Sequence, residues 1–323
     1  MNVIPLLGGV GVGNAMQVFL QNILNALQWG SFYALIALGY TLVYGVIRLI
    51  NFAHGDIFMV GAYIGFFAAT FLIGTYPVHL PFALPNGVIF IFTILLSMLL
   101  TAVLGVTLER VAYRPLRRKG ANRLYVVITA LMAGLLLENG NLALLGARRL
   151  KFPDLIVTKV YTIAGVTFTN IKVLVIIITI LVFLALEFII RKTRLGMAMR
   201  AISYDRMAVP LMGIPVDRVI VFTFILGSSM AALAGVLFVT AYPVLEPYMG
   251  AMIGWKAFIA AVLGGIGDIR GAFFGGFLLG FIEILTVAFF PSTFRDLLSF
   301  TILLLILSAK PTGLFGVAKA TKI

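Results

Sequence analysis

The sequence predicts an all-α polytopic membrane protein with about eight to ten transmembrane helices. Of its 323 residues, 62% are hydrophobic and only 11% are charged, whereas ordinary soluble domains have about 25% charged residues. The mean hydropathy of +1.14 is too high for a soluble core, which would leave much apolar surface in water. Apolar stretches of roughly 20 residues, the length that crosses a bilayer, also recur along the chain. We therefore expect a single transmembrane domain over residues 1–323.

Polar, basic or Gly-rich segments divide the apolar stretches into candidate spans. Met16–Gln28 is also apolar but carries five amide side chains, so it is either an interfacial helix or the start of a long first span. The last three spans are short or nearly continuous, which leaves the exact number of helices open. The spans are expected at residues 30–47, 56–75, 87–108, 124–146, 171–190, 218–240, 253–267, 271–290 and 297–309.

Basic residues predict which loops face the cytoplasm. Two loops, 109–123 and 191–218, together hold 12 of the 24 Lys and Arg residues. Because cytoplasmic loops are enriched in Lys and Arg, we place both loops and the C-terminus in the cytoplasm and the N-terminus outside. The loop 147–170 opposes this assignment, since it should be external yet carries four basic residues. The expected location is the cytoplasmic (inner) membrane.

Composition argues against several functional classes. The net charge of +13 does not indicate nucleic-acid binding, because the basic residues lie in short loops between spans. The chain has no cysteine and only two histidines, far apart in sequence, whereas metal ligands come in clusters. No serine triad is visible, so we expect neither a metal site nor an enzyme. The glycines lack the following Lys-Ser or Lys-Thr of a phosphate-binding loop, so we expect no cofactor in this chain, and any ATP would be used by a separate subunit.

The densest glycine cluster, residues 264–280, has two interpretations. Glycines four residues apart let helices approach closely, whereas dense glycine also permits a discontinuous helix beside a cavity. The second interpretation makes Gly264, Gly265 and Gly267 candidates for a substrate path. The cluster shares a Gly-Asp step with residues 51–66, which reflects either an internal repeat or the chance similarity of apolar sequences.

Ionisable side chains within spans are costly in hydrocarbon and indicate function by default. Glu138 and Asn139 lie in an otherwise apolar span and either contact a substrate or form structural hydrogen bonds. Glu283, in the middle of a later span, is a further candidate for the path. Lys256 lies near the outer end of its span and is expected to extend its ammonium group towards the interface.

A polar turn between the first two spans contains Asn51, His54 and Asp56. Asn51 and Asp56 are candidate helix caps, because short polar side chains can accept a hydrogen bond from a free backbone N–H group. Asn51 and His54 join the candidates for the substrate path.

The loop 191–219 is too long to be a plain connector. Thr193–Met207 can form a short amphipathic helix, which Pro210, Gly213 and Pro215 would end. Such a helix either docks a partner protein or lies on lipid headgroups. If it docks a partner, the candidate contact residues are Arg200, Ala201, Asp205, Arg206 and Gly213.

Several segments carry a family resemblance that covers nearly the whole chain in order. The most specific are NFAHG at residues 51–55 and VLGGIG at residues 262–267, and longer matches lie at residues 30–63, 109–117, 193–220, 230–237 and 256–280. In these segments the chain resembles the LivH-type permease subunits of bacterial branched-chain amino-acid ABC importers. It departs from that pattern at Glu138, where a neutral amide is expected.

The resemblance implies a permease subunit that forms half of a translocation path and is not itself an enzyme. It implies a homologous LivM-type permease partner, two cytoplasmic ATPase subunits that bind ATP and Mg²⁺, and a periplasmic or extracellular substrate-binding protein. Residues 193–219 would be the coupling region that docks on an ATPase. Because urea and short-chain amide importers share these motifs, their permeases are an alternative. A self-contained secondary transporter or channel is the alternative from another class, although it would need coupling-ion sites and the sequence offers only isolated acids.

Overall fold

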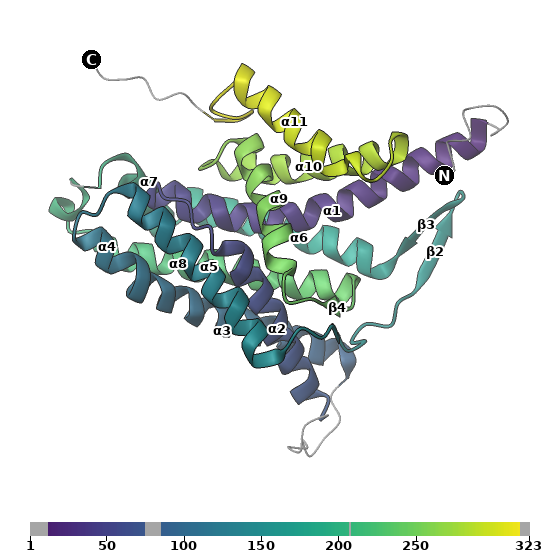
Figure 1. Cartoon of the computed structure of the whole chain (residues 1–323), viewed down its shortest axis with the longest axis horizontal. Helices are drawn as coiled ribbons and strands as arrows, with labels where there is room; N and C mark the ends of the chain where they lie inside the picture. The colour runs from purple at the N-terminus through teal and green to yellow at the C-terminus, as the bar shows by residue number, and fades with distance from the viewer. Residues whose placement is uncertain (1–11, 75–84, 207, 317–323) are drawn as a thin grey trace.

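The structure is a computed structural model that describes residues 12–74, 85–206 and 208–316. It confirms an all-α polytopic membrane protein (Figure 1). Within the described residues, seven helical segments are long and apolar enough to cross a membrane. They contain α1 (Val12–Ile47), α2 (His54–Leu72), α3 (Asn86–Leu108), α5 (Arg123–Leu145), α6 (Asn170–Lys192), α8 (Val216–Ala241) and α10 (Ile269–Phe289).

The shorter elements complete the chain between and after these helices. Two helices, α9 (Met249–Gly264) and α11 (Phe294–Ala309), are shorter but fall on two of the expected spans, so each expected span corresponds to its own helix. The remaining helices are the π-helix η1 (Glu109–Tyr113), α4 (Arg114–Arg118), α7 (Arg194–Tyr204) and the 3-10 helix η2 (Val209–Met212). Two antiparallel pairs of short strands join β1 (Leu150–Lys151) to β4 (Val244–Leu245) and β2 (Val160–Ile163) to β3 (Val166–Thr169).

The first helix is longer than a bilayer requires. α1 has 36 residues, which corresponds to about 54 Å, so Met16–Gln28 is the start of a long first helix. The chain leaves α1 at Arg48, whose φ of 57° is left-handed, and then turns back along the helix. His54 packs against Gly39, which precedes Ile47 by eight residues, or about 12 Å of helix. α2 therefore begins well inside the molecule.

The cap predicted for α2 is wrong. Neither Asn51 nor Asp56 accepts a capping bond there: the N-cap residue is Ala53, and it makes no side-chain cap hydrogen bond. Asn51 instead accepts a hydrogen bond from a tyrosine of η1, and Asp56 lies in the first turn of α2, where a negative charge is favoured by the helix dipole. Tertiary packing holds this helix start in place of a local cap.

Ion pairs bring distant segments to one end of the molecule. Glu187 of α6 pairs with Arg191 at 2.6 Å and with Arg270 of α10 at 2.7 Å. Arg48, just after α1, donates to Ser203 Oγ of α7 at 2.9 Å. We call this the basic end; the β2–β3 hairpin lies at the opposite end, the hairpin end (Figure 1). The position of these segments at one end agrees with the predicted order of the spans, in which successive spans cross the membrane in opposite directions.

α2 and α9 approach each other at two glycines. A Cβ atom added to Gly254 would lie 2.6 Å from Gly55 Cα, and one added to Gly55 would lie 2.7 Å from Gly254 Cα. Because real Cβ atoms do not approach so closely, only glycine fits both positions. The contact sets the first turn of α2 against the middle of α9.

Candidate functional site

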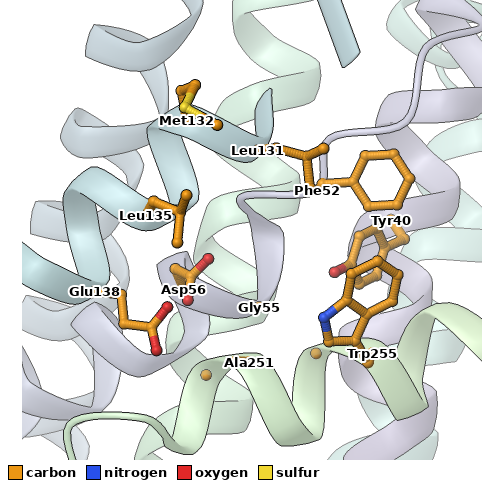
Figure 2. A pocket seen from close by; sticks show the side chains of 12 residues that line it. Tyr40, Phe52, Gly55, Asp56, Leu131, Met132, Leu135, Glu138, Ala251 and Trp255 are labelled. Carbon is orange, nitrogen blue, oxygen red and sulfur yellow. The ribbon is translucent and has the colours of Figure 1, made fainter. Parts of the chain in front are cut away.

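A cavity of about 290 Å³ opens between α1, α2, α5 and α9, where the first turn of α2 lies. Figure 2 shows two kinds of wall: the aromatic rings of Tyr40, Phe52 and Trp255 gather on one side, and the carboxyl groups of Asp56 and Glu138 lie on the other. The remaining lining residues are small or aliphatic: Gly55, Leu131, Met132, Leu135, Gly250, Ala251 and Gly254. The cavity therefore combines negative charge with an apolar and aromatic surface.

Two close contacts position the acidic wall. The approach of Gly55 to Gly254 places Asp56 next to α9, and Gly134 of α5 lies directly against Asp56 Oδ2. Asp56 is only 8% exposed, and its Oδ1 atom has no hydrogen-bond partner within the described residues. Glu138, one turn after Gly134 on α5, is near enough to interact electrostatically with Asp56. A buried carboxylate oxygen without a partner is costly, so this wall can receive a cation or a hydrogen-bond donor.

Ring contacts hold the aromatic wall together. The Phe52 ring lies 5.6 Å from the Trp255 ring and 5.4 Å from the Phe258 ring, and Tyr40 lies 5.9 Å from Phe258. Aromatic faces attract cations and offer apolar area for an aliphatic group. The arrangement can thus hold a small molecule that has a positive group next to an apolar side chain.

Of the four candidate path residues in this region, only Glu138 lines the cavity. Asn139 is exposed, and its amide donates to Leu135 O one turn earlier at 2.8 Å. Asn51 and His54 are buried but do not line the cavity: Asn51 contacts η1, and the His54 ring lies 4.7 Å behind the ring of Tyr40.

The sequence marks Asp56 as an ionisable residue near a span and as a candidate cap, but not as a residue of the substrate path, and it does not single out Tyr40 or Trp255. The signal for Asp56 was present, because an acidic residue next to an apolar span is a functional candidate by default. No local pattern marks Tyr40 or Trp255, which lie on helices far apart in the sequence.

The glycine cluster contains a break between two helices and is also tightly packed. α9 ends at Gly264 and α10 begins at Ile269, and Gly265 and Gly267 have φ values of 109° and 101°. The C-terminal turn covers the break: the N–H of Phe315 donates to Gly264 O at 2.9 Å. Gly264 and Gly265 are buried, whereas Gly267 is exposed at the basic end. None of the three lines the cavity between α2 and α9.

Glu283 lies in a separate ion-pair network near the hairpin end. It is fully buried, accepts a hydrogen bond from Tyr33 Oη at 2.7 Å, and pairs with Arg295 at 2.8 Å and Lys256 at 2.9 Å. Lys256 also pairs with Asp296 at 2.7 Å. Two carboxylates therefore hold the ammonium group of Lys256, a pairing that had not been expected.

The candidate coupling residues gather at the basic end. α7 is amphipathic, with Gly196, Met199 and Ile202 buried. Arg200 is exposed, and its guanidinium donates to Ile190 O. At the end of α7, the Asp205 N–H donates to Ala201 O at 3.0 Å, and Asp205 Oδ1 accepts from the Ala208 N–H at 3.1 Å. Gly213 ends η2 in the left-handed conformation.

A buried charge cluster next to these residues had not been predicted. Arg117 pairs with the fully buried Glu109 at 2.8 Å and with Asp217 at 2.7 Å. Arg206 lies near this cluster: burial, and then the charge of Arg117, lower the pKa of Arg206, while Asp217 opposes the change. The cluster joins η1 and α4 to the first turn of α8, at the end of the coupling region.

Comparison with known proteins gives a consistent result. The chain matches the family model for the permease component of branched-chain amino acid transport systems over residues 22–307. It is 41% identical over 311 residues to the high-affinity branched-chain amino acid transport system permease protein LivH of Salmonella typhimurium. It is 39% identical over 312 residues to LivH of Escherichia coli and 38% identical over 309 residues to BraD, the corresponding permease protein of Pseudomonas aeruginosa. Each match covers 94% of this chain and 98% of the relative.

Proposed function

From the family of permease components of branched-chain amino acid transport systems, to which this chain belongs, we infer that it forms half of the translocation path of an importer for branched-chain amino acids. The observation that carries this proposal is the cavity between α2, α5 and α9. A branched-chain amino acid has an ammonium group next to an aliphatic side chain. Asp56 and Glu138 supply negative charge for the ammonium group. The aromatic wall supplies apolar surface for the aliphatic side chain.

The same cavity argues for the amino acid over urea or a neutral amide. A neutral ligand would leave the buried Asp56 carboxylate without a counter-charge, and an uncompensated buried charge is costly. An ammonium group offsets that cost. Glu138, which differs from the amide expected in the family pattern, adds to the preference for a cation.

A second permease subunit, of the LivM type, covers the open side of the cavity in this proposal. That side exposes Met132 and Leu135 of α5 and Trp255 of α9, and it also presents Glu138 and Asn139. A purely apolar surface could face lipid, but a carboxylate in hydrocarbon is strongly disfavoured. A protein partner is therefore the better cover.

The basic end faces the cytoplasm in this proposal, since Lys and Arg collect on that side of membrane proteins. ATP and Mg²⁺ are bound by two separate ATPase subunits, one of which contacts α7 and η2 through Arg200, Ala201, Asp205, Arg206 and Gly213. A substrate-binding protein delivers the amino acid at the opposite face. The glycine break at Gly264–Gly267 follows α9, and Gly267 shares a cavity with Arg200 of α7. In this proposal the break gives α9 a hinge next to the coupling region.

The test is transport by the complete complex. The chain is co-expressed with its partner permease, ATPases and binding protein and reconstituted into proteoliposomes, with ATP on the side of the basic end. Uptake of labelled leucine is compared with uptake of labelled urea. Leucine uptake that requires both ATP and the binding protein is the expected result.

Two outcomes would overturn the proposal. Urea uptake without leucine uptake would assign the chain to the amide importers. Leucine uptake by this subunit alone and without ATP would make it a self-contained transporter.

A further inference from the structure

A second cavity, of about 370 Å³, lies on the neighbouring face of α9. On this helix Met249, Met252, Ile253 and Lys256 line the second cavity, whereas Gly250, Ala251, Gly254 and Trp255 line the first. α9 therefore separates the two cavities. The second cavity lies beside β4 and the start of α9, at the hairpin end.

One wall of this cavity is cationic. Lys256 and Arg295 line it, but their partners Glu283 and Asp296 do not. The guanidinium of Arg295 uses Nε and Nη2 to reach Glu283. Because a guanidinium has five N–H donors, donors remain for an anionic group in the cavity.

The other walls are aromatic and apolar. Four rings surround the space: Trp29 lies 5.3 Å from Tyr242, 5.9 Å from Tyr33 and 6.0 Å from Phe238. The Cζ atom of Arg295 lies 5.1 Å from the centroid of the Trp29 ring, a cation–π contact that favours this position of the guanidinium. The apolar surface and the cationic groups are therefore placed side by side.

A carboxylate completes the lining. Glu246 lies between β4 and α9 and pairs with Arg149 at 2.8 Å, and both side chains are partly exposed. Exposed ion pairs are weak, so an incoming ammonium group can compete for this carboxylate. The cavity thus presents a cationic wall, an anionic group and an apolar enclosure, which match the carboxylate, the ammonium and the side chain of an apolar amino acid.

We propose that this cavity is a second, outward-facing site for a zwitterionic apolar amino acid, where the substrate binds before it reaches the Asp56 and Glu138 cavity on the other side of α9. Arg295 and Lys256 bind the substrate carboxylate, Glu246 binds its ammonium, and Trp29 and Tyr242 enclose its side chain. This inference rests on the proposed function, because it takes the transported amino acid as the ligand. A phospholipid headgroup also carries an anionic group, and the test separates the two sources.

The experiment measures binding of labelled leucine to the assembled, nucleotide-free complex in nanodiscs of neutral lipid. The Asp56→Asn, Glu138→Gln double variant removes the first cavity's charges and isolates the second site. Adding Glu246→Gln to that background should weaken the remaining binding about tenfold, the scale of a lost hydrogen bond to a charged group. Asp154→Asn, an exposed residue of the same end that lines neither of these two cavities, is the matched control and should leave binding unchanged.

Two ligand analogues test the chemistry directly. Leucinol lacks the carboxylate and 4-methylpentanoate lacks the ammonium, so both should compete at least tenfold more weakly than leucine in the double variant. Tyr242→Leu, which keeps bulk but removes the ring, gives a second variant and should also weaken binding. Both variants are checked for intact assembly by size-exclusion chromatography.

The inference is overturned if the double variant binds no leucine, or if leucinol competes as well as leucine. It is also overturned if anionic phospholipid in the nanodisc displaces leucine, because the site would then hold a headgroup. Failure of wild-type leucine uptake would instead count against the proposed function, so the two failures are distinguishable.

Discussion

Tyr113 Oη donates a hydrogen bond of 2.6 Å to Asn51 Oδ1, and both side chains are buried. Tyr113 ends the π-helix η1, which follows α3 at the basic end, and Asn51 lies in the turn before α2. The backbone carbonyl of Asn51 also accepts from the His54 N–H at 3.1 Å, so this bond fixes the start of the helix that carries Asp56. π-helical turns occur frequently at functional sites. The bond joins the neighbourhood of the coupling region to the wall of the first cavity.

Tyr113→Phe tests whether that connection transmits movement. The variant keeps the ring packing of Tyr113 on Phe224, whose centroid lies 5.5 Å away, but removes the donor. We expect leucine uptake per ATP hydrolysed to fall about threefold to tenfold, while ATP hydrolysis by the complex continues. Tyr125→Phe, at an exposed tyrosine of α5, is the control. An unchanged transport-to-hydrolysis ratio in Tyr113→Phe would show that the bond is only structural.

The buried charge cluster predicts unequal costs for two neighbouring arginines. Arg117→Met leaves the fully buried Glu109 carboxylate poorly compensated, and we expect the free energy of unfolding to fall by about 3 kcal/mol. Arg118→Met breaks an ion pair of an arginine that is 67% exposed and should cost less than about 1 kcal/mol. Unfolding of the two purified variants in denaturant measures the difference, and equal losses would contradict the assigned role of burial.

The acidic wall of the first cavity predicts a loss of transport without a loss of stability. Asp56→Asn and Glu138→Gln keep the shape of each side chain but remove its charge, so the ammonium of the substrate loses its counter-charge. We expect leucine uptake to fall about tenfold or more in each variant, on the scale of a charged hydrogen bond, with assembly unchanged. Uptake at wild-type rates in both variants would remove this cavity from the path.

The close approach of α2 and α9 predicts a sharp contrast between two glycines. Gly254→Ala places a methyl group 2.6 Å from Gly55 Cα, and we expect the overpacking to cost about 1–3 kcal/mol of stability. Gly140→Ala on α5 has no atom within 4 Å of the added methyl group and should retain stability or gain up to about 1 kcal/mol from helix propensity. Thermal unfolding of the detergent-solubilised complex compares them, and similar transitions for both would contradict the contact.

The coupling assignment predicts that charge reversal at the basic end stops transport. Arg200→Glu together with Arg206→Glu should abolish leucine uptake because the ATPase contact loses its positive surface, while membrane insertion stays normal. Lys159→Glu, an exposed residue at the hairpin end, is the control. Co-purification of the ATPases is the second readout, and normal uptake in the double variant would rule out these residues as the contact.

Local patterns predicted the spans well and the interactions of single residues poorly. The span 124–146 corresponds closely to α5 (Arg123–Leu145), because a long apolar stretch is a property of neighbouring residues. The ion pairs of Lys256 were not predicted because its partners, Glu283 and Asp296, belong to α10 and α11. The cap assigned to Asn51 failed for the same reason, since Tyr113 from η1 competes for its side chain.

The sequence by itself determined the membrane-spanning class, the order of the spans and the grouping of basic loops at one end. Hydropathy and charge are properties of each segment by itself, so they can be evaluated without knowing which other segments it contacts. Only the tertiary structure decided which polar groups share a cavity. Asp56 and Glu138 are 82 residues apart in the chain and meet because Gly55, Gly134 and Gly254 let three helices pack without side chains between them. Close packing depends on shape at each contact, which a linear pattern does not encode.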